Sequence, residues 1–144
     1  MQNIKFIGAP KHLLNEGALS SVLVHYASCE GYTIGALEYN FIDSEKMYSL
    51  NKQHLNHLTD TDIITFDYSE EKAITAEVFI SKEMMVINAD TYSQTIEREA
   101  VRLISHALFH CLGYKDKSSK EKDIMRGKEE EFIFSVSRET KQDV

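Results

Sequence analysis

Proline is almost absent from this 144-residue sequence, in which Pro10 is the single occurrence. Runs rich in glycine, serine and proline are also missing, so the composition marks no linker. The chain has the length of one ordinary domain, and we expect residues 1–144 to form a single domain. No apolar run approaches the roughly 20 residues of a membrane span, and the first residues lack the pattern of a secretory signal. We therefore expect no membrane association.

Cysteine and basic residues are scarce as well. The two cysteines, Cys29 and Cys111, are too few for a disulfide framework, which predicts a protein of the reducing cytoplasm. The 16 Lys and Arg residues face 23 Asp and Glu residues, and the formal net charge is −7. This excess of negative charge argues against a large electrostatic surface for binding nucleic acid, which needs clustered positive charge. A small basic patch or a contact through a metal ion stays open.

Apolar residues make up 42% of the sequence, and their periodicity predicts a series of strands and helices. The predicted order is strand, helix, strand, helix, two strands and three helices. Strands mixed with helices that gather late are typical of an α+β domain with one sheet. The predicted strands cover residues 2–7, 33–42, 62–68 and 74–81, and the predicted helices cover residues 12–29, 44–57, 82–91, 94–112 and 118–137.

The most informative segment reads His-x3-His-x2-Gly-x2-Asp, from His106 through His110 and Gly113 to Asp116. In a helix, residues four apart lie on one face with Cβ atoms about 5–6 Å apart, so both imidazoles can bind one ion. Gly113 allows the left-handed backbone that ends a helix, after which three residues suffice to bring Asp116 back. Three protein ligands leave one coordination position open, as in catalytic metal sites.

Two other interpretations of this segment remain. Six histidines in 144 residues give roughly 0.24 chance pairs at this spacing, so the pair can consist of ordinary residues on the rim of the core. Asp116 can instead cap the helix predicted to begin near Ser118. A helical wheel puts the histidines beside Glu99 and Arg102, on the flank of a core stripe. That stripe consists of Ile96, Ala100, Leu103, Ile104, Ala107 and Cys111.

The spacing is also similar to that of metzincin proteases, in which a glutamate directly after the first histidine is the general base. Ala107 occupies that position in this chain. Because alanine cannot accept a proton from water, the sequence argues against peptidase activity.

In this segment the chain resembles the YbeY family of bacterial metal-dependent endoribonucleases, whose motif reads His-Gly-x-Leu-His-Leu-x-Gly-Tyr-Asp-His. His106, His110, Gly113 and Tyr114 match the motif, whereas Asp116 stands at its third histidine. The resemblance implies an α+β domain with a mixed sheet and a metal site on a late helix and the turn after it. It extends over about residues 50–130, with further matches at residues 50–51, 61–66 and 76–81 and at Met125 and Glu129.

The cofactor that the resemblance implies is one transition-metal ion, bound by His106, His110 and the residue at the third position, Asp116. Zinc is the first expectation, because a carboxylate oxygen binds zinc at nearly the same distance as an imidazole nitrogen. Two imidazoles and one carboxylate suit nickel, iron or manganese equally well. The identity of the metal stays open at this point.

The function that the resemblance implies is cleavage of single-stranded RNA in 16S ribosomal RNA 3′-end maturation and ribosome quality control, with the small ribosomal subunit as partner. A basic residue that the family often carries before its Thr-Asp motif falls on Leu55. A non-catalytic ribosome-assembly factor with a structural metal, or a hydrolase of another phosphoester, is therefore an alternative. The general base is unknown, and the weak candidates for catalysis are Glu77, Asp62 and Arg102.

Overall fold

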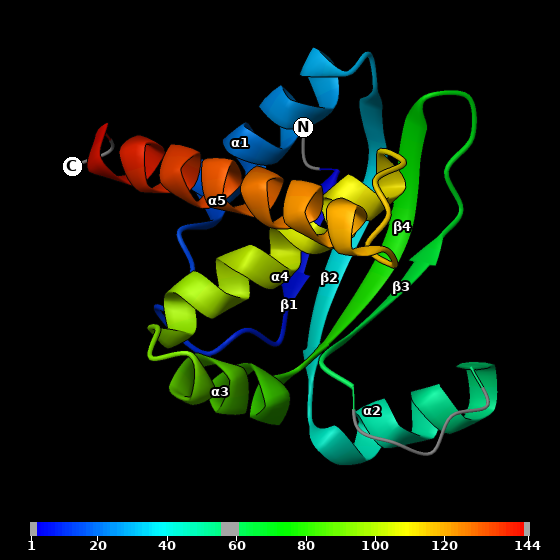
Figure 1. The fold of residues 1–144 in the computed structure, drawn as a ribbon, viewed down its shortest axis with the longest axis vertical. Helices are drawn as coiled ribbons and strands as arrows, with labels where there is room; N and C mark the ends of the chain where they lie inside the picture. Colours follow the sequence, from blue (N-terminus) through cyan, green and yellow to red (C-terminus); the bar gives the residue numbers. More distant parts are fainter. Residues whose placement is uncertain (1–2, 56–60, 143–144) are drawn as a thin grey trace.

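The computed structural model describes residues 3–55 and 61–142, which contain one four-stranded sheet with helices packed against it (Figure 1). The strand order is β1-β2-β4-β3. The strand β1 (Ile4–Ile7) and the strand β4 (Ala73–Ser81) run parallel to β2 (Thr33–Ile42) on its two sides. At the edge, β3 (Ile63–Asp67) runs antiparallel to β4. The α+β class and the mixed sheet are therefore confirmed.

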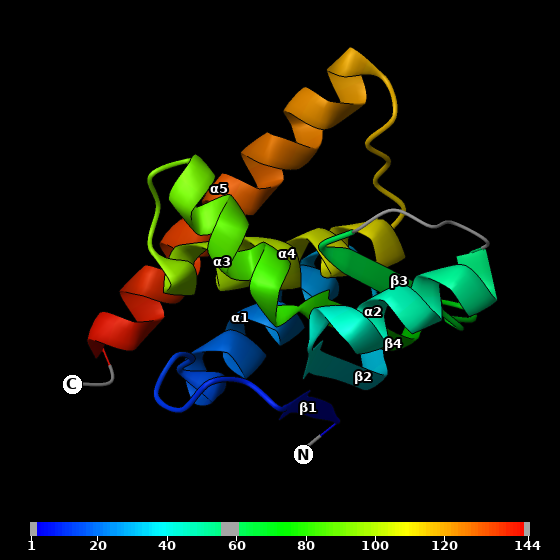
Figure 2. The same cartoon turned by 90° about the horizontal axis from the view of Figure 1, so that it is seen from below.

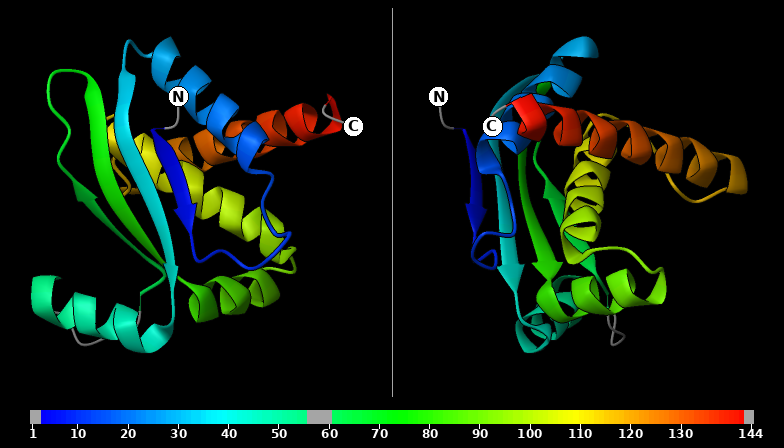
Figure 3. Two further views of the ribbon diagram at one scale, coloured as in Figure 1. Left: turned by 180° about the vertical axis from the view of Figure 1, so that it is seen from behind. Right: turned by 90° about the vertical axis from the view of Figure 1, so that its left-hand side faces the viewer.

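The helices of the described residues are α1 (Glu16–Cys29), α2 (Ser44–Leu50), α3 (Lys82–Thr91), α4 (Ile96–Cys111) and α5 (Ser119–Gln142), and a π-helical turn covers Asn51–Leu55. Three of them, α1, α4 and α5, lie on one face of the sheet (Figure 3). The helix α2 lies at the end of the sheet where β2 and β4 finish, and α3 follows β4 directly (Figure 1). The helices α1, α4 and α5 thus form a layer that can carry a site away from the strands.

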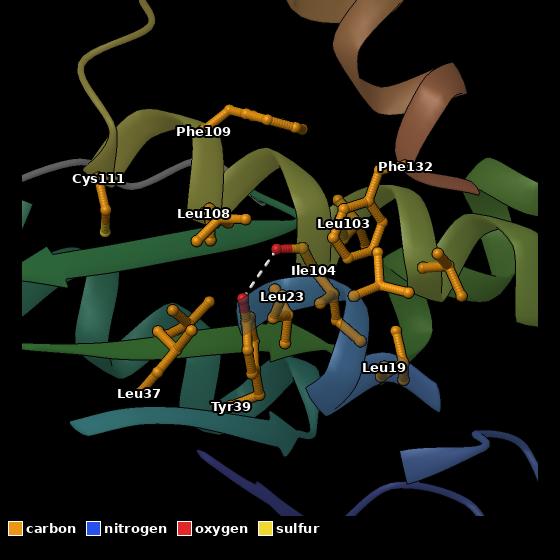
Figure 4. Close-up of a cluster of buried hydrophobic side chains, with 14 of the residues drawn as sticks. Leu19, Leu23, Leu37, Tyr39, Leu103, Ile104, Leu108, Phe109, Cys111 and Phe132 are labelled. Carbon is orange, nitrogen blue, oxygen red and sulfur yellow. Dashed lines mark hydrogen bonds between the residues drawn. The ribbon is translucent and has the colours of Figure 1, made fainter. Parts of the chain in front are cut away.

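The register between β2 and β4 shows which side chains point to each face of the sheet. Tyr39 lies opposite Val78, and both side chains are fully buried. The Tyr39 hydroxyl donates to the carbonyl of Ile104 on α4, 2.9 Å away (Figure 4). Because successive side chains of a strand alternate, Glu38 and its partner Glu77 point to the opposite face. Groups on α4 are therefore separated by the sheet from the side chains of that second face.

The ring of Phe109 connects the helices on the covered face. It is fully buried on α4 and makes edge-to-face contacts with Tyr26 of α1 and Phe132 of α5, with ring centroids 5.9 and 6.3 Å apart. Burial of a phenylalanine side chain contributes about 1.5–3 kcal/mol, and each such ring pair adds ~1 kcal/mol. The cluster holds α5 against α4 at the residue directly before His110, one of the predicted metal ligands.

The start of the first predicted helix is wrong by four residues. The helix begins at Glu16, because the side chain of Asn15 caps it by accepting a hydrogen bond from the amide of Ala18 at 3.0 Å. His12 has a φ of +62°, which a right-handed helix does not contain. The last predicted helix ends five residues too early, at 137 instead of Gln142. In the second predicted helix, α2 ends at Leu50 and the π-helical turn continues to Leu55, and residues 56 and 57 lie outside the described ranges. The other predicted bounds lie within two residues of the observed ones.

The core stripe predicted for α4 is confirmed for every member except the first, Ile96. Ile96 is 39% exposed, because it is the first residue of α4 and lies before the point where the helix packs against the core. The whole stretch of residues 91–97 is exposed. The other members of the stripe are buried: Ala100, Leu103, Ile104, Ala107 and Cys111.

Candidate metal centre

The end of α4 turns the chain back toward the histidines of the same helix. Gly113 has a φ of +101°, which residues with a side chain rarely adopt. Its amide donates to the carbonyl of His110 at 3.0 Å, and the amide of Tyr114 donates to the carbonyl of Phe109 at 2.9 Å. These two bonds form the Schellman motif, which commonly ends helices at a glycine. The turn leaves Asp116 beside the last two turns of α4.

His106, His110 and Asp116 converge on one point. The two Nε2 atoms are 3.1 Å apart, and Oδ2 of Asp116 lies 3.3 Å from Nε2 of His106 and 3.6 Å from Nε2 of His110. Ligand atoms at 2.0–2.1 Å from a tetrahedral ion are about 3.3–3.4 Å from one another. The three donor atoms therefore have the separations of three corners of such a tetrahedron, and the residues fit a metal ion.

One side of this cluster is open to solvent. The side chains of His110 and Asp116 are 34% and 37% exposed, whereas that of His106 is 16% exposed. Three donors with an accessible fourth side are the arrangement of catalytic metal sites, in contrast to the closed four-ligand sites that stabilise folds.

Glu129 of α5 orients His106 from the protein interior. Its carboxylate oxygen Oε2 lies 2.6 Å from Nδ1 of His106, and the residue is only 4% exposed. An ionised carboxylate can only accept, so Nδ1 carries the proton and Nε2 keeps its lone pair. That lone pair points toward Asp116 and His110. Carboxylate–histidine pairs of this kind set the tautomer and the ring orientation of metal ligands.

Arg102 balances the charge of the buried carboxylates behind the cluster. Its guanidinium donates to both oxygens of Glu99 at 2.9 and 2.7 Å and to Glu129 at 3.4 Å. These hydrogen bonds to Glu99, together with the attraction of the neighbouring carboxylates, raise the pKa of Arg102 above the already high value of an ordinary arginine. Asn88 of α3 donates to Glu99 and to Asp62, at 3.2 and 3.1 Å. A continuous polar network thus runs from Asp62, directly before β3, to His106 of the candidate metal site.

Comparison with known proteins places the chain among its relatives. The family described as Endoribonuclease YbeY matches residues 12–137. The chain belongs to the YbeY family. An endoribonuclease YbeY of Flavobacterium johnsoniae is 38% identical over 119 residues, which are 83% of this chain and 86% of that protein. One of Cytophaga hutchinsonii is 43% identical over 105 residues, which are 72% of this chain and 73% of that protein.

The fold has a counterpart among solved structures. The solution structure of TM1509 from Thermotoga maritima superimposes with a TM-score of 0.70 and covers 97% of this chain and 93% of that one. The sequence identity is 22%, so this likeness shows the fold alone.

Of the three residues predicted as weak catalytic candidates, the fold connects Asp62 and Arg102 to the candidate metal site and places Glu77 on the other face of the sheet. Asp62 and Arg102 belong to the polar network, with 3.9 Å between carboxylate and guanidinium. Glu77 lies on the sheet face that points away from α4, where it is exposed and accepts a hydrogen bond from the Tyr68 hydroxyl at 3.2 Å. Leu55 lies in the π-helical turn, and its side chain is outside the part that the structure describes.

The cap of α5 is supplied by residues other than Asp116. The Ser118 hydroxyl accepts from the amide of Glu121 at 3.1 Å, and the Glu121 carboxylate accepts from the amide of Ser118 at 3.0 Å. This reciprocal pair is a capping box. The hydrogen bond from the Ser118 amide lowers the pKa of Glu121. The alternative in which Asp116 caps this helix is therefore not the arrangement that the chain adopts.

The sequence pattern did not indicate the roles of Glu129 and Asn88. Glu129 is 23 positions from His106, and Asn88 is 26 positions from Asp62. Local periodicity carries no information about such pairs, since both depend on how α3 and α5 pack against α4. The one available signal was the family match at Glu129, which indicated the residue but not its hydrogen bond to His106.

A cleft of about 530 Å³ opens beside the cluster, with His106 and Asp116 in its wall. Its other walls come from the exposed segment before α4 and from the first half of α5, which projects away from the sheet (Figure 2). No helix within the described ranges is long and apolar enough to cross a membrane.

Proposed function

We propose that this chain is a metal-dependent endoribonuclease of single-stranded RNA whose ion is bound by His106, His110 and Asp116. The observation that carries the proposal is the spacing of their donor atoms, 3.1, 3.3 and 3.6 Å, which suits one tetrahedral ion. Membership in the YbeY family, whose relatives are named endoribonucleases, supplies the reaction class. The open side of the cluster leaves room for a phosphodiester.

The chemistry divides between the ion and the residues that orient it. When bound, the ion supplies Lewis acidity toward a phosphoryl oxygen and toward water. Glu129 holds the proton of His106 on Nδ1 and thereby keeps Nε2 available as a ligand. Arg102 bridges the carboxylates of Glu99 and Glu129 and offsets the repulsion between their negative charges. The same bridge fixes α4 and α5 relative to each other at the site.

Zinc is the ion that we propose first, because a site with three N and O donors and an open position is the usual arrangement of catalytic zinc. The carboxylate of Asp116 makes the donor set harder than three imidazoles, so nickel, iron and manganese are the alternatives. For the biological role we propose 16S ribosomal RNA 3′-end maturation and ribosome quality control in the cytoplasm, with the small ribosomal subunit as partner.

The first experiment is elemental analysis of the purified protein beside Asp116→Ala and His110→Ala. We expect about one transition metal per wild-type chain and loss of that metal in both variants, with unchanged far-ultraviolet circular dichroism. His25→Ala is the matched control, since His25 is an exposed histidine on α1. A variant that kept its full metal content and its RNA cleavage would refute the assignment of that residue as a ligand.

A non-catalytic ribosome-assembly factor is the second candidate function. The observation that favours it is the engagement of Arg102 by Glu99 and Glu129, which leaves that arginine little capacity to bind a phosphate. Cleavage of a ribosomal RNA fragment by the metal-loaded protein decides between the two, because an assembly factor binds the fragment and leaves it intact. Metal-dependent turnover of a generic phosphodiester without cleavage of RNA points instead to a hydrolase of another phosphoester.

A further inference from the structure

The residues around the metal cluster cannot by themselves attract RNA. Asp62, Glu99, Asp116 and Glu129 are four carboxylates, and Arg102 is the cation among them. Even a divalent ion would leave this group close to neutral or slightly negative. Since binding of RNA rests on contacts between cations and phosphates, positive charge has to come from a neighbouring surface.

The cleft beside the cluster provides that charge on α5. Lys122 and Arg126 line the cleft and are four residues apart, so they lie on the same face of the helix. Both are exposed, and no carboxylate among the described residues pairs with either of them. The two other cations that line the cleft lie on α4 and are already paired, Arg98 with Glu130 and Arg102 with Glu99.

An exposed aromatic ring lines the same cleft. Tyr92, at the end of α3, is 69% exposed, the largest exposed fraction among the large hydrophobic residues of the described ranges. Unpartnered cations together with an exposed aromatic ring are the two elements with which proteins bind single-stranded nucleic acid. The cations contact phosphates, and the ring stacks on a base of any identity.

We infer that the segment of RNA next to the cleaved phosphate binds in this cleft, with its phosphates on Lys122 and Arg126 and a base stacked on Tyr92. This inference rests on the proposed nuclease function and names the surface that holds its substrate. A cleft of about 530 Å³ has the size of an ordinary small-molecule site, which suits about one or two nucleotides of a single strand. The binding is independent of sequence, because the named groups contact the backbone and the face of a base.

The test measures how binding depends on salt. The probe is a fluorescein-labelled single-stranded RNA of about a dozen nucleotides, 2′-O-methylated against cleavage and checked on a gel, and binding to the metal-loaded protein is followed by anisotropy. For Lys122→Gln/Arg126→Gln we expect the slope of log K against log salt to fall by about 1.4, because each lost contact with a single strand removes about 0.7. Metal content stays unchanged, since neither residue contacts the cluster.

Lys11→Gln/Arg138→Gln is the matched control, because it removes the same charge from two exposed positions outside the cleft. We expect it to keep the slope of the wild type. For Tyr92→Ala we expect binding to weaken about fivefold or more at an unchanged slope. Phe134→Ala removes a ring with a similar exposed fraction, 63%, outside the cleft and leaves affinity unchanged.

The outcomes separate this inference from the proposed function. If the wild type cleaves and binds RNA but Lys122→Gln/Arg126→Gln keeps the full slope, or the control variant loses as much, the cleft is not the binding surface and the nuclease proposal stands. If the metal-loaded wild type neither binds nor cleaves RNA, both proposals are overturned. An unchanged affinity in Tyr92→Ala would refute the stacking of a base on Tyr92 and leave the phosphate contacts of Lys122 and Arg126 standing.

Discussion

His106 on α4 donates its Nδ1 proton to the buried carboxylate of Glu129 on α5, across 2.6 Å. The ligand nitrogen of this histidine is therefore set by a helix 23 positions further along the chain. Packing of Phe109 against Phe132 holds the two helices together near this bond. The candidate metal centre and the interface between α4 and α5 are consequently one structural unit, and changes in either should be measurable in the other.

Removal of the Glu129 charge should weaken metal binding. Partners of a metal-bound histidine typically contribute 10–100-fold to metal affinity, so we expect a loss of roughly that size for Glu129→Ala and a smaller one for Glu129→Gln, which can still accept from Nδ1. Competition with a chelator of known affinity measures the effect. Glu130→Gln is the control, because Glu130 is exposed and pairs with Arg98. Equal affinities of Glu129→Ala and the control would contradict the role of Glu129.

Replacement of Asp116 by histidine should change which metal is bound. Three imidazoles are softer donors than two imidazoles and a carboxylate, so Asp116→His should keep zinc and bind manganese and iron(II) less well, by tenfold or more. Competition between zinc and manganese, read by elemental analysis, gives the ratio for variant and wild type. An unchanged zinc-to-manganese ratio in the variant would show that the side chain at position 116 does not reach the ion.

Gly113→Ala should reduce both stability and metal affinity. A Cβ at this position would contact nothing within 4 Å, so the cost comes from the backbone, whose φ is +101°. A side-chain-bearing residue in this region costs about 1–2 kcal/mol. Part of that strain should be released by opening the turn that positions Asp116. Urea unfolding and chelator competition measure the two effects.

Gly127→Ala is the control for this substitution, because Gly127 lies within α5 with open space around it. Alanine is a better helix former than glycine by about 1 kcal/mol, so this variant should be slightly more stable and bind metal normally. A destabilised Gly127→Ala together with an unaffected Gly113→Ala would reverse the argument.

The folded chain should lose stability at alkaline pH through Tyr39. Its burial, with the nearby Cys111 as a smaller cause, raises the pKa of Tyr39 well above 10. Below about pH 10 the phenol is neutral in both states, and its contribution is fully present. As the pH rises further, the unfolded phenol ionises first, so stability falls by up to about 1.4 kcal/mol per pH unit until the folded pKa is reached.

Urea unfolding between about pH 8 and pH 11 checks this prediction. Tyr39→Phe should show a shallower decline than the wild type, although it loses the hydrogen bond to Ile104 and begins less stable. Burial also raises the pKa of Cys111, to about 12, so some decline remains in the variant. Tyr92→Phe, at an exposed position, should follow the wild type. Parallel curves for Tyr39→Phe and the wild type would contradict the prediction.

Much of this protein was determined by local sequence. The alternation of Leu37, Tyr39 and Phe41 predicts a strand, and the stripe of Ala100, Leu103 and Ala107 predicts a buried helix face, because both depend on repeat distances within one element. The candidate metal ligands were predictable for the same reason. His106 and His110 are neighbours on one helix turn, and a glycine three residues before Asp116 allows the chain to return.

Tertiary structure alone decided the surroundings of these ligands. Glu129 meets His106, and Asn88 meets Glu99 and Asp62, because α3 and α5 pack against α4, which no spacing within one segment encodes. Strand pairing likewise determined that Glu77 faces away from the site. The sequence therefore determined which atoms can bind a metal. The packing of distant elements decided which ring nitrogen of His106 carries the proton and which carboxylates lie near it. It also decided where a cleft opens beside the site.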